Sequence, residues 1–505
     1  MTAPAVPGST PPPQRPRASV TLAILAIAAL IAVLTLHRLG EADVCGSNEA
    51  VEGVFLQQMV EHGAVLFPLE NGRSPMYKPP LFHWTALAID RVAGIRRVTA
   101  LNLRSTTALY AVAGAALTVG FASSFLGPLD AVLAGLILAG SYQYIEQGRI
   151  GRVDMTLCFF ETFALFAFMW WIAPLPPKRR RAILRYLFAL ALGLAVLAKG
   201  PVGAILPVVA CALFLSAERR LSDFRALATP GPILLAIVVG GSWYTACLFG
   251  NRYGFLHRQI GSENFGRFFG ALGAMAPWYY VKPILVNSAP LSLLVPLAVY
   301  FALRTFWRSP GQDEPAEAAT DRAIHCVRLF AIFWIATVLF FSVAAYKRRA
   351  YLLPLWPPSA VILAWWLGTL ARTGFWGRVL RSAVAVTCAA LIVFNFFYFP
   401  YKEVRDCRGD SYRQTAAQIN RIVGPGEPLY SFGLGEPAPL LFYLDRDAPP
   451  IEGKLGDAPP GYVIIPADVW AEEKDESLDL APIYESSTGP RKLLLLRHGK
   501  AYARR

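Results

Sequence analysis

The chain has 505 residues and a formal net charge of +14, and 55% of its residues are hydrophobic. Its mean hydropathy is +0.42. Soluble domains contain about 45–50% apolar residues, so this composition indicates an integral membrane protein rather than a string of soluble domains. The basic residues are scattered among apolar segments, which argues against nucleic-acid binding and fits the positive-inside bias of membrane proteins.

The chain begins with a proline-rich segment, residues 1–18, that has no apolar periodicity. This composition predicts a disordered cytoplasmic tail. Residues 19–36 then form an uncharged apolar run of the length that crosses a bilayer. A cleaved signal peptide is the alternative, but the preceding tail and the lack of a small-residue cleavage site after Leu36 favour a membrane helix.

Further apolar segments follow the first one, and together they predict about eleven transmembrane helices. The stretch 186–225 could hold a different hairpin geometry, so roughly ten to thirteen spans are expected. The predicted spans after the first are 105–126, 129–145, 154–173, 186–198, 201–216, 230–249, 278–303, 325–344, 351–371 and 379–399.

Lysine and arginine residues in the short loops set the expected orientation, because cytoplasmic loops are enriched in them. With the N-terminus inside, alternate loops carry the basic residues, and the crossings place the C-terminal segment outside. The residues that define the cytoplasmic face are Lys178, Arg179, Arg180, Arg181, Arg185, Arg219, Arg220, Arg225, Arg304, Arg308, Arg322, Arg372, Arg378 and Arg381.

Three longer regions lie on the outer face of this topology: residues 37–104, 250–277 and the tail 400–505. The tail has strand-like runs and a helix-like run, which predict a small α/β domain; these runs are 462–465, 493–496 and 412–423. We therefore expect an all-α polytopic membrane domain over 19–399, followed by a small α/β non-cytoplasmic domain over 400–505. The loop 37–104 is expected to be the outer catalytic loop, with juxtamembrane helices.

Two of the seven cysteines, Cys45 and Cys407, lie in the predicted outer regions, while the other cysteines fall in or beside apolar segments. Disulfides persist on the non-cytoplasmic side of a membrane. We therefore predict a bridge between Cys45 and Cys407 that ties the first outer loop to the tail domain, with two separate thiols as the alternative. No cysteine or histidine spacing indicates a zinc site.

Polar residues gather at several places on the same predicted side of the membrane. Ionisable residues at membrane depth are costly and mark functional cavities, so their convergence on one face predicts a site there. The residues concerned are Glu49, Glu52 and the run 76–84 in the first loop, Glu146, Arg149, Arg152 and Asp154 around the fourth span, Lys199 at the fifth junction, Glu263, Asn264 and Arg267, and the run 346–349.

The cluster Lys347, Arg348 and Arg349 breaks the positive-inside pattern, and it predicts an anionic ligand such as a phosphate. Snorkelling of these side chains to lipid headgroups is the alternative. Carboxylates beside such a pocket, Glu49 and Asp154, could act as a general base, a sugar-hydroxyl acceptor or a metal ligand. Structural ion pairs are the alternative for each of them.

Two proline junctions place lysines at this face. In Lys78-Pro79-Pro80 the prolines exclude a helix at Lys78, which predicts a fixed, extended turn. In Lys199-Gly200-Pro201 the junction breaks what would otherwise be one long apolar segment. The alternative interpretation is that both junctions only end a helix and have no part in a site.

These motifs, in this order, resemble bacterial glycosyltransferases of the GT-C superfamily, in the branch related to protein O-mannosyltransferases and lipid A aminoarabinose transferases. The resemblance covers residues 19 to about 400. The motifs are Asn48-Glu49, then Lys-Pro-Pro-Leu-x-x-Trp at 78–84, Arg-x-x-x-x-Asp at 149–154, Leu-x-Lys-Gly-Pro at 197–201, Glu-x-x-x-Arg-Phe at 263–268, Pro-Trp-Tyr-Tyr at 277–280, and Tyr-Leu-x-Pro at 351–354 after the basic run.

The resemblance implies roles for individual residues. Glu49 and Asp154 would be catalytic, and Lys78, Lys347, Arg348 and Arg349 would bind the donor phosphate. Asn48 stands where the family commonly has aspartate, so either Glu49 acts as the base here or the acceptor needs no strong base. Asn264 replaces a frequent histidine, which argues against a family-type divalent metal site at that position, and no other cofactor is assigned. The substrate pocket would comprise Asn48, Tyr77, Trp84, Arg152, Lys199, Glu263, Arg267 and Tyr351.

The function that the resemblance implies is transfer of a sugar, with inversion, from a polyprenyl-phosphate donor to a lipid, glycan or protein acceptor. The expected setting is a monomer in a bacterial inner membrane, with the active site and C-terminus on the periplasmic side. A lipid transporter or flippase is the alternative, although the polar residues crowd one face and no repeated halves are visible. A sensor or scaffold would leave the boundary lysines and carboxylates unexplained.

Overall fold

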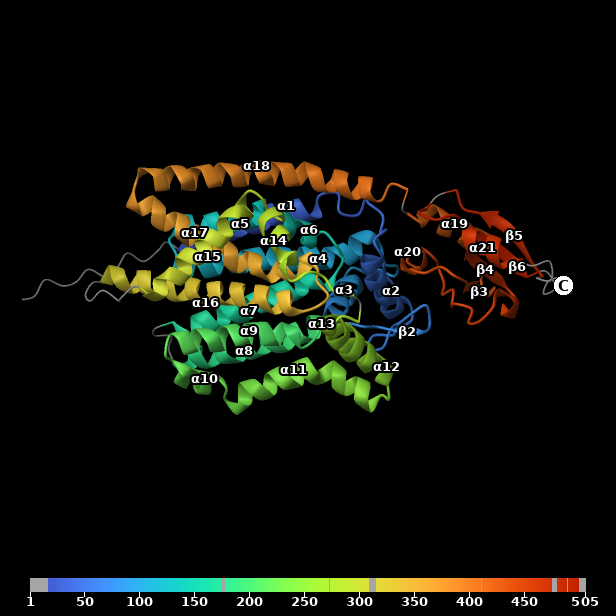
Figure 1. The fold of residues 1–505 in the computed structure, drawn as a ribbon, viewed down its shortest axis with the longest axis horizontal. Coiled ribbons are helices and arrows are strands. Elements are labelled where there is room, and N and C mark those ends of the chain that lie inside the picture. Colours follow the sequence, from blue (N-terminus) through green and yellow to red (C-terminus); the bar gives the residue numbers. More distant parts are fainter. Residues whose placement is uncertain are drawn as a thin grey trace, which may run out of the picture.

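The computed structural model describes residues 17–173, 178–271, 273–307, 315–409, 411–474, 479–487 and 489–498. A helical bundle forms most of the chain, and a small domain with a β-sheet lies at one end of it (Figure 1). The predicted N-terminal tail falls almost wholly outside the described residues. The fold class expected from the sequence, a polytopic helical protein with a small C-terminal α/β domain, is confirmed.

Among the described residues, eight helices are long and apolar enough to cross a membrane. Each corresponds to a span predicted from hydropathy, because about 20 apolar residues in a helix match the bilayer core. These helices are α1 (Arg17–Leu36), α4 (Ala100–Phe125), α7 (Val153–Ile172), α8 (Lys178–Lys199), α11 (Pro230–Phe249), α16 (Pro315–Val343), α17 (Trp356–Thr373) and α18 (Phe375–Asp406).

The remaining predicted spans are formed by less regular helices. The predicted span 278–303 is a pair, α14 (Val281–Val286) and α15 (Leu291–Arg304), bent by 113°. The helices α5 (Pro128–Gly140) and α9 (Val202–Ala217) are apolar but shorter than the other spans. Every one of the predicted spans therefore has a helical counterpart, although not all of them have full length.

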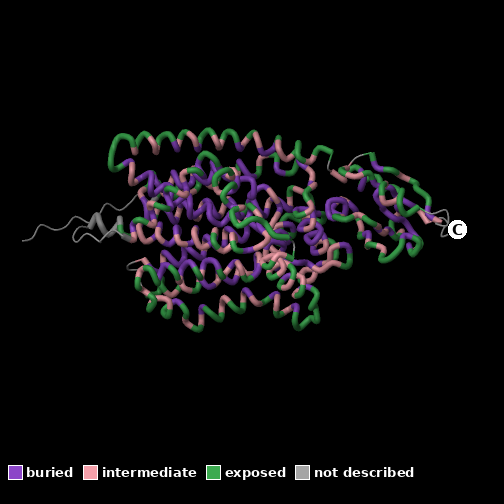
Figure 2. Tube along the Cα trace, in the orientation of Figure 1, coloured by how far each residue is buried: buried purple, intermediate pink, exposed green. Residues whose placement is uncertain are grey.

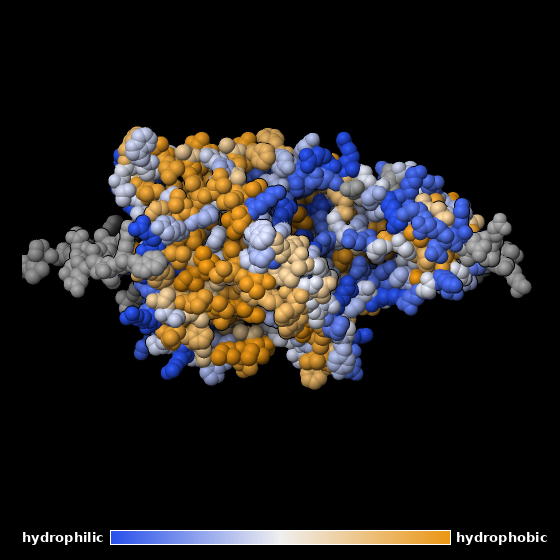
Figure 3. Space-filling view, viewed as in Figure 1, coloured by the Kyte–Doolittle hydropathy of each residue, from blue (hydrophilic) through white to orange (hydrophobic). Residues whose placement is uncertain are grey.

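The bundle has a buried centre and a lipid-facing rim. The apolar windows of α7 and the α17 segment are 83% and 94% buried, whereas those of α11 and α18 are only 22% buried. Figure 2 shows α11 and α18 as exposed helices on opposite sides of a buried interior. Apolar side chains cover the sides of the bundle, and hydrophilic ones gather at its ends and on the sheet domain (Figure 3). This pattern is the one expected of a bundle whose sides face lipid.

The end of the bundle next to the sheet domain carries several short elements. Most of them belong to the loops that the sequence placed on the outer face, whereas α6, η2 and η4 overlap the ends of predicted spans. Together they surround the start of α7 and the end of α8 (Figure 1). These elements are α2 (Ser47–Glu61), β1 (Leu69–Glu70), β2 (Ser74–Pro75), α3 (Leu81–Val92), α6 (Tyr142–Gly148), α12 (Tyr253–Leu256), the π-helix η1 (His257–Gly266), α13 (Arg267–Phe269), and the 3₁₀ segments η2 (Pro277–Tyr280) and η4 (Arg349–Leu355).

The opposite end holds the start of α8 and the start of α18, together with α10 (Leu221–Leu227) and η3 (Thr305–Trp307). The basic loop residues that predicted the cytoplasmic face belong to this end, for example Arg179 and Arg220. The two sets of loops that the charge pattern separated therefore lie at opposite ends of the bundle.

The C-terminal domain contains a four-stranded sheet in the order β3-β4-β6-β5. The strands β3 and β4 are parallel, and β6 runs antiparallel to both of its neighbours. Each residue of β4 is buried, which explains its continuous apolar sequence. The elements are α19 (Arg413–Ile422), β3 (Leu429–Ser431), α20 (Ala438–Leu441), η5 (Leu455–Asp457), β4 (Tyr462–Pro466), α21 (Ala467–Glu473), β5 (Leu480–Glu485) and β6 (Leu493–His498).

A disulfide bond joins Cys45, just before α2, to Cys407, just after α18, with Cα atoms 5.7 Å apart. These are the two cysteines that the sequence placed on the outer face. The bond therefore fastens the connection to the C-terminal domain onto the first outer loop.

Candidate active site

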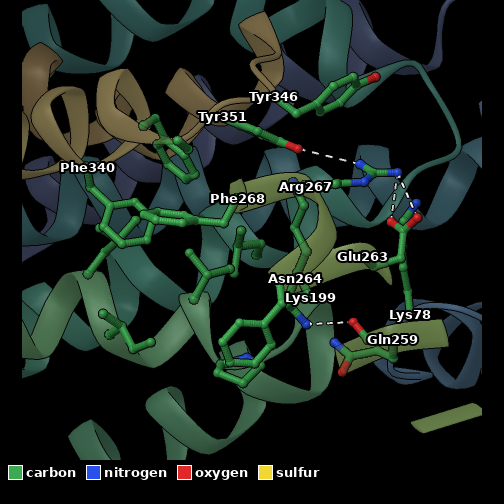
Figure 4. Close-up of a pocket in the computed structure, with 18 of the residues that line it drawn as sticks. Lys78, Lys199, Gln259, Glu263, Asn264, Arg267, Phe268, Phe340, Tyr346 and Tyr351 are labelled. Atoms are coloured by element: carbon green, nitrogen blue, oxygen red, sulfur yellow. Dashed lines mark hydrogen bonds and ion pairs between the residues drawn. The ribbon is translucent and has the colours of Figure 1, made fainter. Parts of the chain in front are cut away.

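A cavity of about 390 Å³ lies where the start of α7 and the end of α8 meet η1, α13 and η4. Its lining divides into a polar part and an aromatic part. Figure 4 shows Lys78, Glu263 and Arg267 on one side and Phe268 and Phe340 on the other. Phe265 and Phe269 also line the aromatic part and are exposed at the surface of the bundle. The cavity is therefore amphipathic and reaches the outside of the bundle through its aromatic part.

The turn before α3 holds Lys78 against α2. Lys78 is buried and forms an ion pair with Glu52, and Nε2 of His83 lies 3.1 Å from the other oxygen of Glu52. Burial alone would raise the pKa of Glu52, but the neighbouring charge of Lys78 and contact with His83 lower that pKa to about 2. Glu52 is therefore an anion that holds the Lys78 ammonium, which also lies 4.8 Å from the centre of the Tyr77 ring.

The junction between α8 and α9 places a second lysine, Lys199, at the cavity. Gly200 has a φ of +99°, which ends α8 in the left-handed conformation that glycine tolerates, and Pro201 prevents the helix from continuing. Lys199, the last residue of α8, is thereby free to form an ion pair with Asp154 in the first turn of α7. Its Nζ lies 4.7 Å from the centre of the Tyr351 ring. Arg152 Nη2 contacts the second oxygen of Asp154 at 3.1 Å.

A third cation comes from the segment that contains η1 and α13. Arg267 pairs with Glu263 at 2.7 Å and reaches the hydroxyl of Tyr351 at 3.5 Å (Figure 4). Its guanidinium also lies 5.3 Å from the centre of the Tyr346 ring. The Nε of Arg267 is buried and has no hydrogen-bond acceptor among the described residues. The guanidinium of Arg267 therefore lines the cavity with one donor that the protein leaves unpaired.

The pocket predicted from the sequence is partly assembled. Tyr77, Lys78, Asp154, Lys199, Glu263, Arg267 and Tyr351 all line the cavity. Arg152 lies behind it as a partner of Asp154. These residues come from five separate stretches of the sequence, and each stretch lies at a helix end or in an irregular helical segment.

The basic cluster 347–349, by contrast, points in three directions and none of its members lines the cavity. Lys347 is buried and donates to the carbonyls of Met275 and Ala344. Arg348 donates to Asn48 at 2.9 Å, and Arg349 pairs with Glu146 at 2.9 Å. The chain turns here from α16 into η4, so consecutive side chains leave it at different angles.

Three other predicted residues also lie away from the cavity lining. Glu49 is buried in a two-point pair with Arg104, with distances of 2.8 and 3.0 Å, and accepts the backbone N–H of Gly151. Asn48 is exposed and bound to Arg348. Trp84 donates its indole N–H to the carbonyl of Val65. The geometry gives Glu49 and Trp84 structural partners and leaves Asp154 as the one of the two predicted catalytic carboxylates that lines the cavity.

Three residues of the site had no role assigned from the sequence. Glu52, rather than Glu49, faces Lys78. Tyr346 lines the cavity beside Arg267. Glu161 lies two helical turns after Asp154 on α7, is fully buried, and neither of its oxygens has a partner among the described residues. A carboxylate in the middle of an apolar span was a signal that could have identified Glu161.

Comparisons with known proteins show which proteins the chain is similar to. The family described as dolichyl-phosphate-mannose-protein mannosyltransferase matches residues 58–250. An uncharacterised protein of Aquifex aeolicus is 28% identical over 66% of this chain and 62% of its own length. The undecaprenyl phosphate-alpha-4-amino-4-deoxy-L-arabinose arabinosyl transferase of Pectobacterium atrosepticum is 28% identical over 53% of this chain and 48% of its own length. The chain thus spans roughly half to two thirds of the length of these curated relatives.

Two solved structures share the fold. The crystal structure of ArnT from Cupriavidus metallidurans bound to undecaprenyl phosphate superposes with a TM-score of 0.77 at 17% identity, over 95% of this chain and 98% of that one. The archaeal oligosaccharyltransferase AglB from Archaeoglobus fulgidus has a TM-score of 0.53 at 12% identity, over 90% of this chain and 70% of that one. The sequence relatives and the shared fold confirm the resemblance to GT-C glycosyltransferases and favour a transferase over a transporter.

Proposed function

We propose that this chain transfers a sugar from a polyprenyl-phosphate carrier to an acceptor at the end of the bundle that bears the C-terminal domain, which we assign to the periplasmic face of a bacterial inner membrane. The observation that carries the proposal is the amphipathic cavity, where lysine and arginine side chains lie next to an exposed aromatic opening. A ligand with an anionic head and an apolar chain complements both parts. The fold of a relative solved with undecaprenyl phosphate supports the same ligand class.

In this proposal the carrier phosphate binds between Lys78, Lys199 and Arg267. Arg267 supplies a planar guanidinium at the cavity wall, and the two lysines supply point charges. The first isoprene units leave past Phe265, Phe268 and Phe269 toward the lipid. The roles of Lys347, Arg348 and Arg349 become structural, because other protein groups already occupy these side chains.

The reaction is a direct displacement at the anomeric carbon. An acceptor oxygen forms a bond to that carbon while the bond to the phosphate oxygen breaks, and the electron pair leaves with the polyprenyl phosphate. Negative charge grows on the departing phosphate, so the cations around it stabilise the transition state more than the ground state. Attack from the face opposite to the leaving group inverts the anomeric configuration.

The ion pairs of the carboxylates in this region indicate which chemical class of acceptor the site can use. A hydroxyl acceptor requires a base, whereas a phosphate acceptor is already anionic and requires none. Asp154 and Glu263 are each held by cations, and Glu49 is bound to Arg104 away from the cavity. Each of these three carboxylates is already engaged by a cation, so we propose a phosphate-bearing acceptor, such as a phosphorylated lipid of the lipid A type.

The donor sugar is proposed from the relatives. The names of several of them specify a transferase of undecaprenyl phosphate-linked 4-amino-4-deoxy-L-arabinose. A polyprenyl-phosphate amino pentose is therefore the first donor to test, with neutral pentose and hexose donors beside it.

The test is donor turnover by the purified full-length protein in detergent. Mass spectrometry follows release of polyprenyl phosphate from each donor, with a lipid extract of the host membrane as acceptor. Arg267→Ala is expected to lower turnover about 100- to 1,000-fold. The matched control is Arg349→Ala, which removes the same side chain outside the cavity and leaves Glu146 paired with Lys402 at 3.0 Å. That control is expected to stay within about threefold of wild type.

Two results would count against the proposal. If Arg267→Ala and Arg349→Ala turn over donor equally fast, the phosphate site is not in this cavity. If the wild type consumes no donor while native lipid is present, the transporter alternative takes precedence, and a lipid-flipping assay in vesicles would decide it.

A further inference from the structure

Helix α2 connects the candidate site to the C-terminal domain. Glu52, on one side of the helix, pairs with Lys78 and is 1% exposed. The next residue, Gly53, is also buried, and its Cα faces the ring of Phe442 in the C-terminal domain. A β-carbon at Gly53 would lie 2.5 Å from two atoms of that ring. The glycine therefore allows a close contact that any other residue would obstruct.

Phe442 follows α20 directly and is 3% exposed. Its carbonyl accepts a hydrogen bond from Nε2 of Gln57 at 2.8 Å, one turn further along α2. The neighbouring Tyr443 accepts the backbone N–H of Val44 at 2.6 Å, just ahead of α2. The segment 442–443 thus contacts both the residues just before α2 and the middle of this helix.

Asn71 exchanges two buried hydrogen bonds with the backbone of Ala448, but this residue lies beyond the end of α2. Two contacts between the C-terminal domain and the first outer loop lie nearer the surface. Gln58 donates to Asp447 at 3.2 Å, and Arg73 pairs with Glu452, in exposed positions. Exposed polar pairs of this kind contribute little to stability. The buried ring of Phe442 seated on Gly53 is therefore the contact through which the domain most strongly sets the position of α2.

We propose that Phe442 is a positioning residue for the transfer reaction, and that it acts through Gly53 and Glu52 on the Lys78 ammonium. This inference rests on the proposed function, in which Lys78 binds the donor phosphate. A displacement of about 1 Å at a reacting group can cost about 100-fold in rate. The C-terminal domain is then a part of the active site, although none of its described residues lines the cavity.

A purely structural role of Phe442 predicts different behaviour, and the domain offers a matched control. Phe432 is a half-buried phenylalanine in the cluster on the other face of the sheet, with Val463 and Ile465. Truncation of either ring weakens the domain. Only truncation of Phe442 removes the contact with α2.

The experiment compares Phe442→Ala, Phe442→Leu, Phe432→Ala and Gly53→Ala in the full-length protein in detergent. It measures kcat and KM for release of polyprenyl phosphate together with the unfolding temperature. Phe442→Ala and Gly53→Ala are expected to lower kcat about 30- to 100-fold. Phe442→Leu should stay within about fivefold of wild type because it keeps an apolar side chain at the contact. Phe432→Ala should leave kcat unchanged although it lowers the unfolding temperature.

The Gly53→Ala/Phe442→Leu double variant provides a rescue. The smaller leucine makes room for the added methyl group, so this double variant should be more active than Gly53→Ala alone. Equal activities of Phe442→Ala and Phe432→Ala, or full activity of Gly53→Ala, would overturn the inference. The Leu and Gly53 variants keep the test valid if Phe442→Ala fails to fold.

A second readout separates this inference from the proposed function. The rate at which an amine-reactive reagent labels Lys78, followed by mass spectrometry, reports the position of the ammonium without any turnover. Lys78 is 7% exposed, so labelling should be slow in the wild type and clearly faster in Phe442→Ala than in Phe432→Ala. If the wild type uses no donor but this difference is found, the positioning stands and the proposed function fails. If donor is used but the labelling rates and kcat values are equal, only the inference fails.

Discussion

The ion pair between Lys78 and Glu52 can be tested by removing one charge at a time. Both side chains are buried, and the pKa of Glu52 falls from 4.5 to about 2 in the folded protein. At 1.36 kcal/mol per pKa unit, this shift corresponds to roughly 3 kcal/mol of stability. Because the folded pKa is the lower one, this contribution is present above pH 4.5 and is lost as the pH falls toward 2.

Lys78→Ala leaves Glu52 buried with only His83 beside it. Breaking a buried pair in this way costs about 3–5 kcal/mol, because the remaining charge is uncompensated. Replacing both residues, in Lys78→Ala/Glu52→Gln, removes that charge, so the double variant should be about 2 kcal/mol more stable than Lys78→Ala alone. Donor turnover should be lost in both, since the ammonium is absent from each.

The assay is a double-mutant cycle at pH 7.5 that measures unfolding of the detergent-solubilised protein by tryptophan fluorescence, together with donor turnover. The matched control is Lys492→Ala, which breaks an exposed pair with Glu485 and should change stability by less than about 1 kcal/mol. Additive effects of the two single changes would refute the coupling of Lys78 to Glu52. Activity of Lys78→Ala near the wild-type level would refute its contact with the phosphate.

Three further predictions concern stability. Cys407→Ser opens the bond to Cys45 and should cost roughly 2–5 kcal/mol, and the wild type under reducing conditions should match this variant. Gly200→Ala places a β-carbon 2.5 Å from Gln259 at a φ of +99°, so it should lower both the unfolding temperature and turnover, whereas Gly241→Ala, in open space, should change neither. Burial raises the pKa of Asp90 to about 6, so ionised Asp90 destabilises the fold as the pH rises from about 4 through 6. Asp90→Asn should therefore raise the unfolding temperature at pH 8 and not at pH 4, and no difference between these pH values would contradict the burial effect.

The membrane spans were predictable because the bilayer imposes a simple requirement on the sequence. Hydropathy located even the span that forms the bent pair of α14 and α15. The hydropathy of a segment depends on its residue types and not on whether the helix is straight. The charge pattern likewise separated the two ends of the bundle. Neither signal could reveal that α15 is bent by 113° relative to the segment Pro277–Val286 that contains α14.

The sequence predicted site residues where a proline or glycine breaks a helix directly after them. Lys78 precedes two prolines and Lys199 precedes Gly200-Pro201, and both lysines line the cavity. The choice between Glu49 and Glu52 was not predictable, because it depends on the rotation of α2 against its neighbours. Arg104, which lies in α4, forms an ion pair with Glu49, whereas Glu52 forms its ion pair with Lys78.

The basic cluster 347–349 shows that adjacent charges in a sequence do not by themselves locate a binding site. The sequence reports three adjacent cations, but their directions depend on the turn from α16 into η4. Acceptors far away in the sequence, such as Met275 for Lys347 and Asn48 for Arg348, decide where those side chains go. Tyr346, immediately before this cluster, lines the cavity although none of the three cations does.

The most direct test of sugar transfer by displacement is the anomeric configuration of the product. A polyprenyl-phosphate sugar with ¹³C at the anomeric carbon is incubated with the protein and host lipid in detergent, and NMR compares the anomeric carbon in donor and product. Direct displacement predicts that the label appears on the acceptor with the configuration opposite to that of the donor. A product that retains the configuration, or a donor that stays intact, would contradict it.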